Sequence, residues 1–198
     1  MDPAAETLAV DTRGCEPRLG PATVHLMTAM AKHFRPVLAA LLLLGTSAAT
    51  SAATIILVRH AERAGEMPAN PPITAEGQRR AQYLAKMLAE ARVEAIFTTE
   101  TLRTQQTAAP AAEKLAIRPV VIPQQETDAL VARLKALGEN QTVLVVGHSG
   151  TMAAIVEKLG GGKIAPVADS EYNRMLVVHT GSDGKVSVTT LRFDAGKE

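Results

Sequence analysis

The chain has 198 residues, of which 46% are hydrophobic and 21% charged, a composition that suits one globular domain with an ordinary core. A formal net charge of +1 excludes a strongly basic or acidic surface for nucleic acid or membranes, and 3% aromatic residues without Trp argue against a platform for stacking bases. The single cysteine, Cys15, excludes a disulfide framework and a cysteine metal cluster.

Residues 30–53 have the pattern of a secretory signal peptide. Basic residues at 32–35 precede a short apolar run at 37–44, and small residues then continue to Ala53. The apolar run is shorter than the ~20 residues that span a membrane, so the pattern predicts cleavage after Ala52 or Ala53 and no stable membrane anchor. The expected location of the mature protein is therefore periplasmic or secreted.

Residues 1–29 precede this signal and carry acidic residues with scattered Pro and Gly. A signal peptide normally opens the chain, so our hypothesis is that translation begins at Met30 or Met27. The expected organisation is a non-native or disordered extension over 1–29, a signal over 30–53 and one domain over 54–198.

The first half of that domain alternates strands and helices. Residues 54–58 are continuously apolar and β-branched, which is typical of a strand buried on both faces. A helix capped by Thr74 follows, with apolar residues at Ala81, Leu84, Ala85 and Leu88. The remaining predicted elements are a strand at 94–98, a helix at 101–115 that Pro110 kinks or breaks, and a strand at 119–122.

The second half continues the alternation. The patterns predict a helix at 127–137 with Gly138 as its C-cap, a strand at 142–146, a helix to about Leu159, and strands at 174–180 and 186–193. This order indicates an α/β domain built as a three-layer α/β/α sandwich with a mostly parallel central sheet.

Polar clusters follow three of the predicted strands. Arg59 and His60 come directly after 54–58, Arg103 lies near a helix start after 94–98, and His148 comes directly after 142–146. Ligands gather beyond the carboxyl ends of strands in such sheets, so we expect these side chains to meet. Guanidinium groups suit phosphate oxygens, and a neutral imidazole can attack phosphorus.

Four segments then resemble the histidine phosphatase superfamily, the phosphoglycerate-mutase-like clan, in the expected order. Residues 58–63 are similar to its Arg-His-Gly signature, with Ala61 in place of Gly. Residues 73–77 are similar to its Leu-Thr-x-x-Gly segment, 99–108 to Ser-x-Leu-x-Arg-x-x-x-Thr-Ala, and 146–149 to Val-x-His. The match suggests a small exported bacterial-type member with a phosphoglycerate-mutase-like fold.

The resemblance implies a role for each matching residue. His60 would be the nucleophile that becomes phosphohistidine, and His148 would bond the phosphoryl group in the transition state. Arg59 and Arg103 would hold the phosphoryl oxygens, and Arg63 would add a further contact. No metal and no cofactor would be needed, because these groups supply the positive charge.

The general acid is the least determined role. It should be a carboxyl group that protonates the leaving oxygen. Glu126, after the strand at 119–122, is the first choice, with Asp128, Glu100 and Glu62 as rivals. Some small family members that cleave phosphohistidine lack this acid.

Other functions stay open at this point. A non-catalytic relative would only bind phosphorylated ligands, and a mutase would return the phosphoryl group to its substrate. A serine esterase would use Ser149, in an imperfect G-x-S-x-G match, with Asp169 and His179. The expected partner is a phosphorylated small molecule or macromolecule, and the sequence fixes neither the substrate nor the oligomeric state.

Overall fold

The computed structural model describes residues 52–65 and 69–194, so the predicted extension and nearly all of the predicted signal lie outside the described residues. The strands are β1 (Ala52–Arg59), β2 (Val93–Thr98), β3 (Val120–Val121), β4 (Thr142–Gly147), β5 (Arg174–Gly181) and β6 (Val186–Arg192). The helices are α2 (Ala75–Met87), α3 (Leu102–Leu115), α4 (Thr127–Lys135) and α5 (Ser149–Leu159), with a short 3₁₀ helix at Gln124–Glu126.

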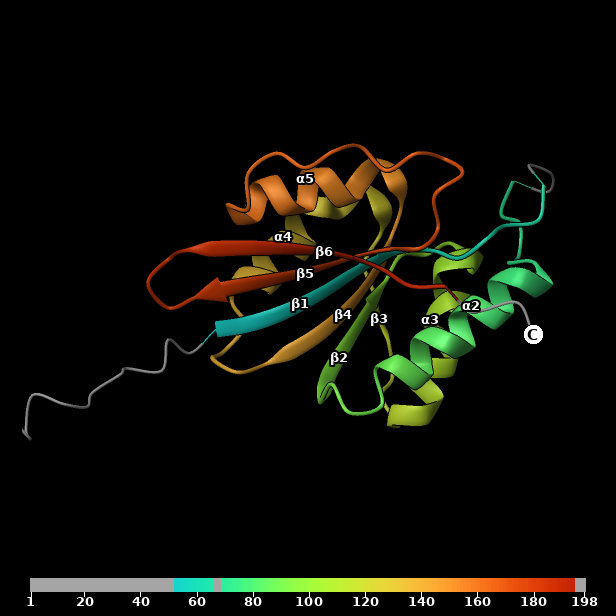
Figure 1. The fold of residues 1–198 in the computed structure, drawn as a ribbon, viewed down its shortest axis with the longest axis horizontal. Coiled ribbons are helices and arrows are strands. Elements are labelled where there is room, and N and C mark those ends of the chain that lie inside the picture. Colours follow the sequence, from blue (N-terminus) through green and yellow to red (C-terminus); the bar gives the residue numbers. More distant parts are fainter. Residues whose placement is uncertain (1–51, 66–68, 195–198) are drawn as a thin grey trace, which may run out of the picture. The chain divides into compact units, whose positions relative to one another are not determined.

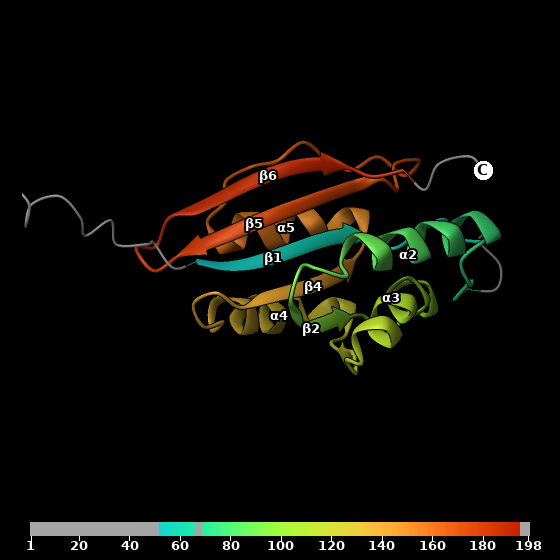
Figure 2. The same ribbon diagram turned by 60° about the horizontal axis from the view of Figure 1, so that its bottom comes forward.

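The six strands form one mixed sheet in the order β3-β2-β4-β1-β5-β6 (Figure 2). Strands β3, β2, β4 and β1 are parallel neighbours, whereas β5 pairs antiparallel with both β1 and β6. The continuous apolar run of β1 matches its place inside the sheet, because a strand with helices on both faces has no solvent side. Ile55, Leu57 and Val58 are all fully buried.

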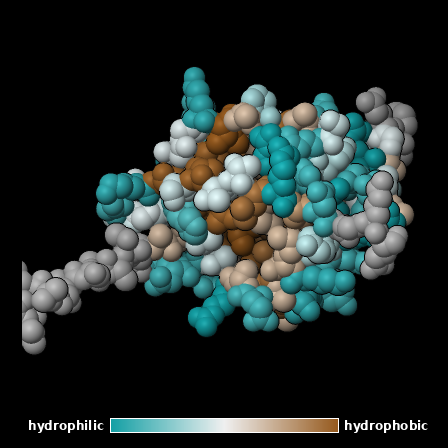
Figure 3. Space-filling view, in the orientation of Figure 1, coloured by the Kyte–Doolittle hydropathy of each residue, from teal (hydrophilic) through white to brown (hydrophobic). Residues whose placement is uncertain are grey.

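Helices cover both faces of the sheet, which confirms the predicted three-layer arrangement (Figure 1). Helices α4 and α5 pack on one face through residues such as Leu134 and Ile155. Helices α2 and α3 pack on the other face through residues such as Leu84 and Ala108. Figure 3 shows hydrophobic residues near the middle of one face of the molecule, surrounded by hydrophilic ones. None of the described helices has the length and hydropathy needed to span a membrane.

The register of β1 against β4 decides which residues leave the sheet together. Val58 pairs with Val146 and Arg59 with Gly147, so both strands end at the same level. The next residues, His60 and His148, therefore emerge side by side. The amide of His60 continues the pairing by donating to the carbonyl of Gly147 at 2.9 Å.

Two boundary predictions differ from the structure. The expected break at Pro110 is absent, since α3 runs through it as one helix. Pro110 removes the helical bond to the carbonyl of Gln106, but buried residues around it (Thr107, Ala108 and Ala111) hold the helix on the sheet.

Gly138 is the second difference. Helix α4 ends at Lys135 with Ala136 as its C-cap, so the predicted cap lies two residues too late. The Gly138 amide instead donates to Oε1 of Gln141 at 2.7 Å, which builds the turn into β4. The side chain of Gln141 therefore replaces the helix end as the partner of this amide.

Candidate active site

The segment after β1 is held by its own backbone and by two helices. The Thr74 amide donates to the carbonyl of Glu62 at 2.8 Å, and the Ala61 amide donates to the Thr107 hydroxyl at 2.9 Å. Gly77 lets α2 approach closely, because a Cβ atom there would lie 2.6 Å from the Glu62 carbonyl oxygen. The matched segments 73–77 and 99–108 therefore fix the segment that carries His60.

His60 is 3% exposed, and its Nδ1 lies 2.8 Å from the carbonyl oxygen of Ala61. A carbonyl only accepts, so Nδ1 carries the hydrogen and Nε2 keeps its lone pair. Burial lowers the pKa of His60 to about 3, against the Ala61 bond, and the charge of Arg59 lowers it further. His60 is therefore a neutral imidazole at neutral pH.

His148 stands beside His60 at the end of β4. The two ring centroids are 5.4 Å apart in an edge-on arrangement. Thr151 in the first turn of α5 fixes the backbone of His148, whose amide donates to the Thr151 hydroxyl at 3.2 Å. Burial, followed by the charges of Arg103 and Arg59, lowers the pKa of His148 to about 4. Both imidazoles are thus neutral at pH 7.

Arg103 reaches the same place from the first turn of α3. One of its terminal nitrogens, NH2, lies 3.4 Å from Nδ1 of His148. Its Nε is buried and has no hydrogen-bond partner among the described residues. Burial and the nearby charge of Arg63 lower the pKa of Arg103. The crowding of like charges points to a site built for an anion.

Arg59 is 4% exposed, and its guanidinium group contacts both backbone carbonyls and an aromatic ring. Its NH1 donates to the carbonyls of Ala168, Asp169 and Glu171 at 2.9, 2.8 and 3.2 Å. Its guanidinium carbon lies 4.2 Å from the ring centroid of Tyr172. Its Nε, like that of Arg103, is a buried donor for which no partner occurs in the described ranges. Arg59 therefore orders the 168–172 loop and still has donor capacity.

These side chains line one open polar pocket of about 310 Å³. Five of the six predicted site residues belong to it, and the sixth, Glu126, does not. Its lining consists of Arg59, His60, Arg63, Ala69, Pro71, Arg103, Gln124, His148, Ser149, Gly150 and Asp169. Asp169 is the one carboxylate in this lining, and Arg63 is tied to the rim by a 2.7 Å bond to the Gly65 carbonyl.

The carboxylates considered as general acids lie away from the pocket or have other partners. Glu126 is exposed, and Asp128 pairs with Lys158. Oε2 of Glu100 accepts from the Gln124 amide at 2.8 Å. Glu62 is bound by Arg80, with Nε–Oε distances of 2.8 and 3.0 Å. The pocket lining thus includes the predicted histidines and arginines but none of these four carboxylates.

The esterase alternative is wrong in its geometry. Ser149 donates to Oδ1 of Asp169 at 3.2 Å, but Nδ1 of His179 bonds to the Thr54 hydroxyl at 3.1 Å. Thr54 lies near the start of β1, about 16 Å along the strand from Arg59. His179 therefore stands at the opposite end of the sheet from the serine that it would have to activate.

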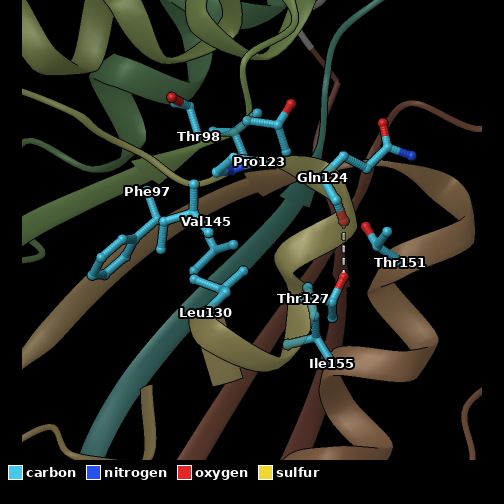
Figure 4. A pocket seen from close by; sticks show the side chains of 13 residues that line it. Phe97, Thr98, Pro123, Gln124, Thr127, Leu130, Val145, Thr151 and Ile155 are labelled. Carbon is cyan, nitrogen blue, oxygen red and sulfur yellow. Dashed lines mark hydrogen bonds between the residues drawn. The ribbon is translucent and has the colours of Figure 1, made fainter. Parts of the chain in front are cut away.

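A second, smaller pocket of about 20 Å³ shares Gln124 with the polar one (Figure 4). Its walls are mostly apolar and come from β2, β4, α4 and α5, with Phe97, Val145, Leu130 and Ile155 among them. Gln124 borders both pockets, and its carbonyl accepts from Thr127 at 3.1 Å. The volume is that of about one water molecule, so this hollow is part of the packing.

Two features of the site have no readable signal in the sequence, and a third, the contact of Thr99, lies in the matched segment 99–108 without following from its pattern. The 168–172 loop has no periodicity, although Arg59 and Tyr172 join it to the two histidines. Asp169 was considered only for an esterase, and it lies instead at the rim of the polar pocket. The hydroxyl of Thr99 lies 3.0 Å from Nε2 of His148. No group of three or more His, Cys, Asp and Glu side chains suited to a metal occurs within 52–65 and 69–194.

Comparison with known proteins agrees with this geometry. Residues 55–125 match the histidine phosphatase superfamily (branch 1) family model. The protein histidine phosphatase SixA in complex with tungstate is 19% identical with a TM-score of 0.58, covering 70% of this chain and 96% of that one. An alpha-ribazole phosphatase from Shigella flexneri is 17% identical with a TM-score of 0.59, covering 73% and 99%.

A mycobacterial glucosyl-3-phosphoglycerate phosphatase has the same fold at 12% identity and a TM-score of 0.54, covering 73% of this chain and 100% of that one. No curated protein matches the sequence significantly. At these identities the solved structures establish the fold alone, and the family match covers the β1 to α3 part of the site. The chain is therefore similar to the histidine phosphatase superfamily over residues 55–125, and it shares its fold with these solved phosphatases.

Proposed function

We propose that this chain is an exported phosphatase that hydrolyses phosphate monoesters, without a metal, through a phosphohistidine on His60. The observation that carries the proposal is the state of the His60 ring. Its Nδ1–H is committed to the Ala61 carbonyl, and its low pKa keeps it neutral. Nε2 therefore carries an available lone pair, as a nucleophile needs.

The arginines supply what the phosphoryl group requires. Phosphoryl transfer depends on positioning and on positive charge around the equatorial oxygens. Arg59 and Arg103 each have a buried Nε–H without a partner in the described chain, and both line the pocket with His60. Hydrogen bonds to charged groups are the strong class, so the two guanidinium groups in this lining favour a phosphoryl group over a neutral ligand.

Two displacements at phosphorus complete the reaction. Nε2 of His60 forms a bond to phosphorus while the bond from phosphorus to the leaving oxygen breaks. Water then attacks the phosphohistidine, the N–P bond breaks, and inorganic phosphate leaves with His60 neutral again. His148, 5.4 Å away between ring centroids, stands where it can contact the transferring oxygens.

The leaving group decides between two substrate classes. An alkoxide leaving oxygen needs a proton from an acid, and Glu126 stays the predicted donor although it is exposed and outside the pocket lining. A phosphoryl group on nitrogen leaves without a protein acid, because a basic nitrogen takes its proton from water. Glu62, Glu100 and Asp128 are engaged elsewhere, and Asp169, the one carboxylate of the pocket lining, accepts from the Ser149 hydroxyl; this favours the second candidate, a phosphoramidate such as phosphohistidine.

A substrate panel tests both candidates. We expect turnover of an aryl phosphate that persists with a chelator and disappears in His60→Ala. The matched control is His179→Ala, at the other end of the sheet, which should retain turnover. A chelator that abolishes activity would refute the metal-free route, and binding of phosphate without any turnover would indicate the non-catalytic alternative.

Comparison of leaving groups then identifies the class. If no protein acid operates, kcat/KM for a phosphoramidate and an aryl phosphate should exceed that for an alkyl phosphate by about 100-fold or more. Glu126→Gln should then leave all three values unchanged. Similar values for the three substrates, with a selective loss of alkyl phosphate turnover in Glu126→Gln, would instead identify Glu126 as the acid.

Export is part of the proposal and has its own test. The predicted cleavage after Ala52 or Ala53 falls at the start of β1, where Ala52 pairs with Gly181 and Ala53 with Thr180. We expect N-terminal sequencing of protein from the periplasm or medium to begin at Ala53 or Thr54. A protein found only in the cytoplasm, or one that retains Cys15, would contradict this.

A further inference from the structure

A chain of hydrogen bonds lies behind His148, on the side away from the pocket. Nε2 of His148 is 3.0 Å from Oγ1 of Thr99, and Oγ1 of Thr99 is 3.0 Å from Oγ1 of Thr104. Oγ1 of Thr104 in turn donates to the carbonyl of Thr101 at 2.9 Å. The three side chains linked in this way are buried, with exposed fractions of 6% for His148, 9% for Thr99 and 0% for Thr104.

The last acceptor limits the direction of this chain. A carbonyl can only accept, so the single hydroxyl hydrogen of Thr104 is used on a carbonyl, that of Thr101. Oγ1 of Thr104 can then accept from Thr99 at 3.0 Å or from the Thr101 hydroxyl at 3.2 Å. When Thr99 is the donor, its Oγ1 keeps a lone pair toward His148, and Nε2 of His148 supplies the hydrogen.

The other ring nitrogen of His148 gives the same tautomer. Nδ1 faces Arg103, whose NH2 lies 3.4 Å away and can only donate. A hydrogen on Nδ1 would set two donors against each other, whereas a lone pair accepts. The two sides of the ring therefore agree on a hydrogen at Nε2 and a lone pair at Nδ1.

We propose that Thr99 is a positioning residue that fixes His148 as the Nε2–H tautomer, a proposal that rests on the phosphatase function proposed above. In this tautomer Nδ1 accepts a proton from an incoming phosphoryl monoanion. The O–H bond of the phosphoryl group breaks and an N–H bond forms at Nδ1. The products are an imidazolium, still donating from Nε2 to Thr99, and a dianionic phosphoryl group. Dephosphorylation returns the proton to the released phosphate.

The charges around His148 fit this proton transfer. Arg103 faces it from α3, Arg59 and neutral His60 face it from the end of β1, and Asp169 lies at the rim of the same pocket. Before binding, burial and the two arginines keep the pKa of His148 low. A bound phosphoryl group offsets the arginine charges, which makes the imidazolium favourable only while substrate is present.

The first test measures the tautomer directly and needs no turnover. Long-range ¹H–¹⁵N correlation spectra at pH 7, with His148 assigned through a His148→Gln variant, distinguish a protonated from an unprotonated ring nitrogen. We expect Nε2–H in the wild type and in Thr99→Ser, and a mixture of the two tautomers in Thr99→Val, where only Arg103 still favours the lone pair on Nδ1. A wild-type His148 protonated at Nδ1 would overturn the inference, whatever the enzyme hydrolyses.

The second test uses the pH profile. If the monoanion is the productive form, kcat/KM of the wild type should fall about tenfold per pH unit above the second phosphate pKa of about 6. Thr99→Val should lose about 10- to 100-fold of kcat/KM at pH 5.5 and lose this falling limb, and Thr99→Ser should restore both.

The matched control is Thr98→Val. Thr98 is the neighbouring threonine, is 3% exposed, and its hydroxyl has no partner in the described part of the chain. This variant removes an equivalent buried hydroxyl and should keep both the tautomer and the falling limb. A pH profile that is the same in wild type and Thr99→Val would refute the proton-acceptor role, even with the tautomer as expected.

Discussion

The two buried neutral histidines should make the fold lose stability in mild acid. An unfolded histidine takes up a proton near pH 6.5, whereas the pKa is lowered to about 3 for His60 and to about 4 for His148. Below pH 6.5 the unfolded state therefore binds more protons than the folded state. By linkage, stability is present above pH 6.5 and falls as the pH drops toward the folded-state values.

The magnitude follows from the proton difference. Each pH unit with one extra proton on the unfolded state costs about 1.4 kcal/mol. Between about pH 6.5 and pH 5 both His60 and His148 stay unprotonated in the fold, so each contributes about 2 kcal/mol. Partial solvent access and residual structure in the unfolded chain reduce this, and we expect a total loss of about 3 kcal/mol.

Urea unfolding in phosphate-free buffer at pH 7 and pH 5 measures this loss. The double variant His60→Gln/His148→Gln removes both titrating groups and should flatten the difference to about 1 kcal/mol or less. A single variant should remove about half of it. If the wild type were equally stable at both pH values, or if the double variant lost as much as the wild type, the assignment of buried neutral imidazoles would be refuted.

Three further predictions follow from the site and its supports. Inorganic phosphate at about ten times its Kd should raise the unfolding free energy by about 1.4 kcal/mol, and Arg103→Met should abolish that rise in a thermal-shift titration; an unchanged rise would show that phosphate binds elsewhere. Arg59→Met should cost about 3 kcal/mol by urea unfolding, since it removes the hydrogen bonds of Arg59 to three carbonyls of the 168–171 loop, and should raise amide exchange there; exchange that matches the wild type would contradict the holding role of Arg59. Pro110→Ala should stabilise the protein by about 1–3 kcal/mol, because it restores the helical bond to the Gln106 carbonyl; a lower melting temperature would show that α3 is adapted to the proline.

Most of the fold could be predicted because its signals are local. The β-branched run after residue 53, the Thr74 cap and the helix end at about Leu159 each depend on signals within a few residues, and each appears as predicted, with the Gly77 amide bonded to the Thr74 hydroxyl and α5 ending at Leu159 before Gly160 at φ +100°. Pro110 does not break the helix, because buried residues on both sides of it hold α3 on the sheet. Local propensity cannot include that packing.

The site divides in the same way. His60, Arg103 and His148 could be brought together from the sequence because parallel strands place their carboxyl ends at one edge. Asp169 and Tyr172 could not, since they lie in a loop whose course is set by the buried guanidinium of Arg59, more than 100 residues earlier in the chain. A polar group that holds a distant loop leaves no periodic signal in that loop.

The positive charges of the arginines in this site affect both the pKa of the histidines and the binding of a phosphoryl group. Positive charge that lowers the pKa of His60 keeps its lone pair available, and in the proposed mechanism the same charge attracts the anion that His60 attacks. Removal of Arg103 should therefore weaken anion binding and, at acidic pH, also reduce the fraction of neutral His60. The two losses are not independent, so a double-mutant cycle between Arg103 and Arg59 should show coupling in kcat/KM that grows as the pH falls, because the protonation of His60 depends on both charges at once.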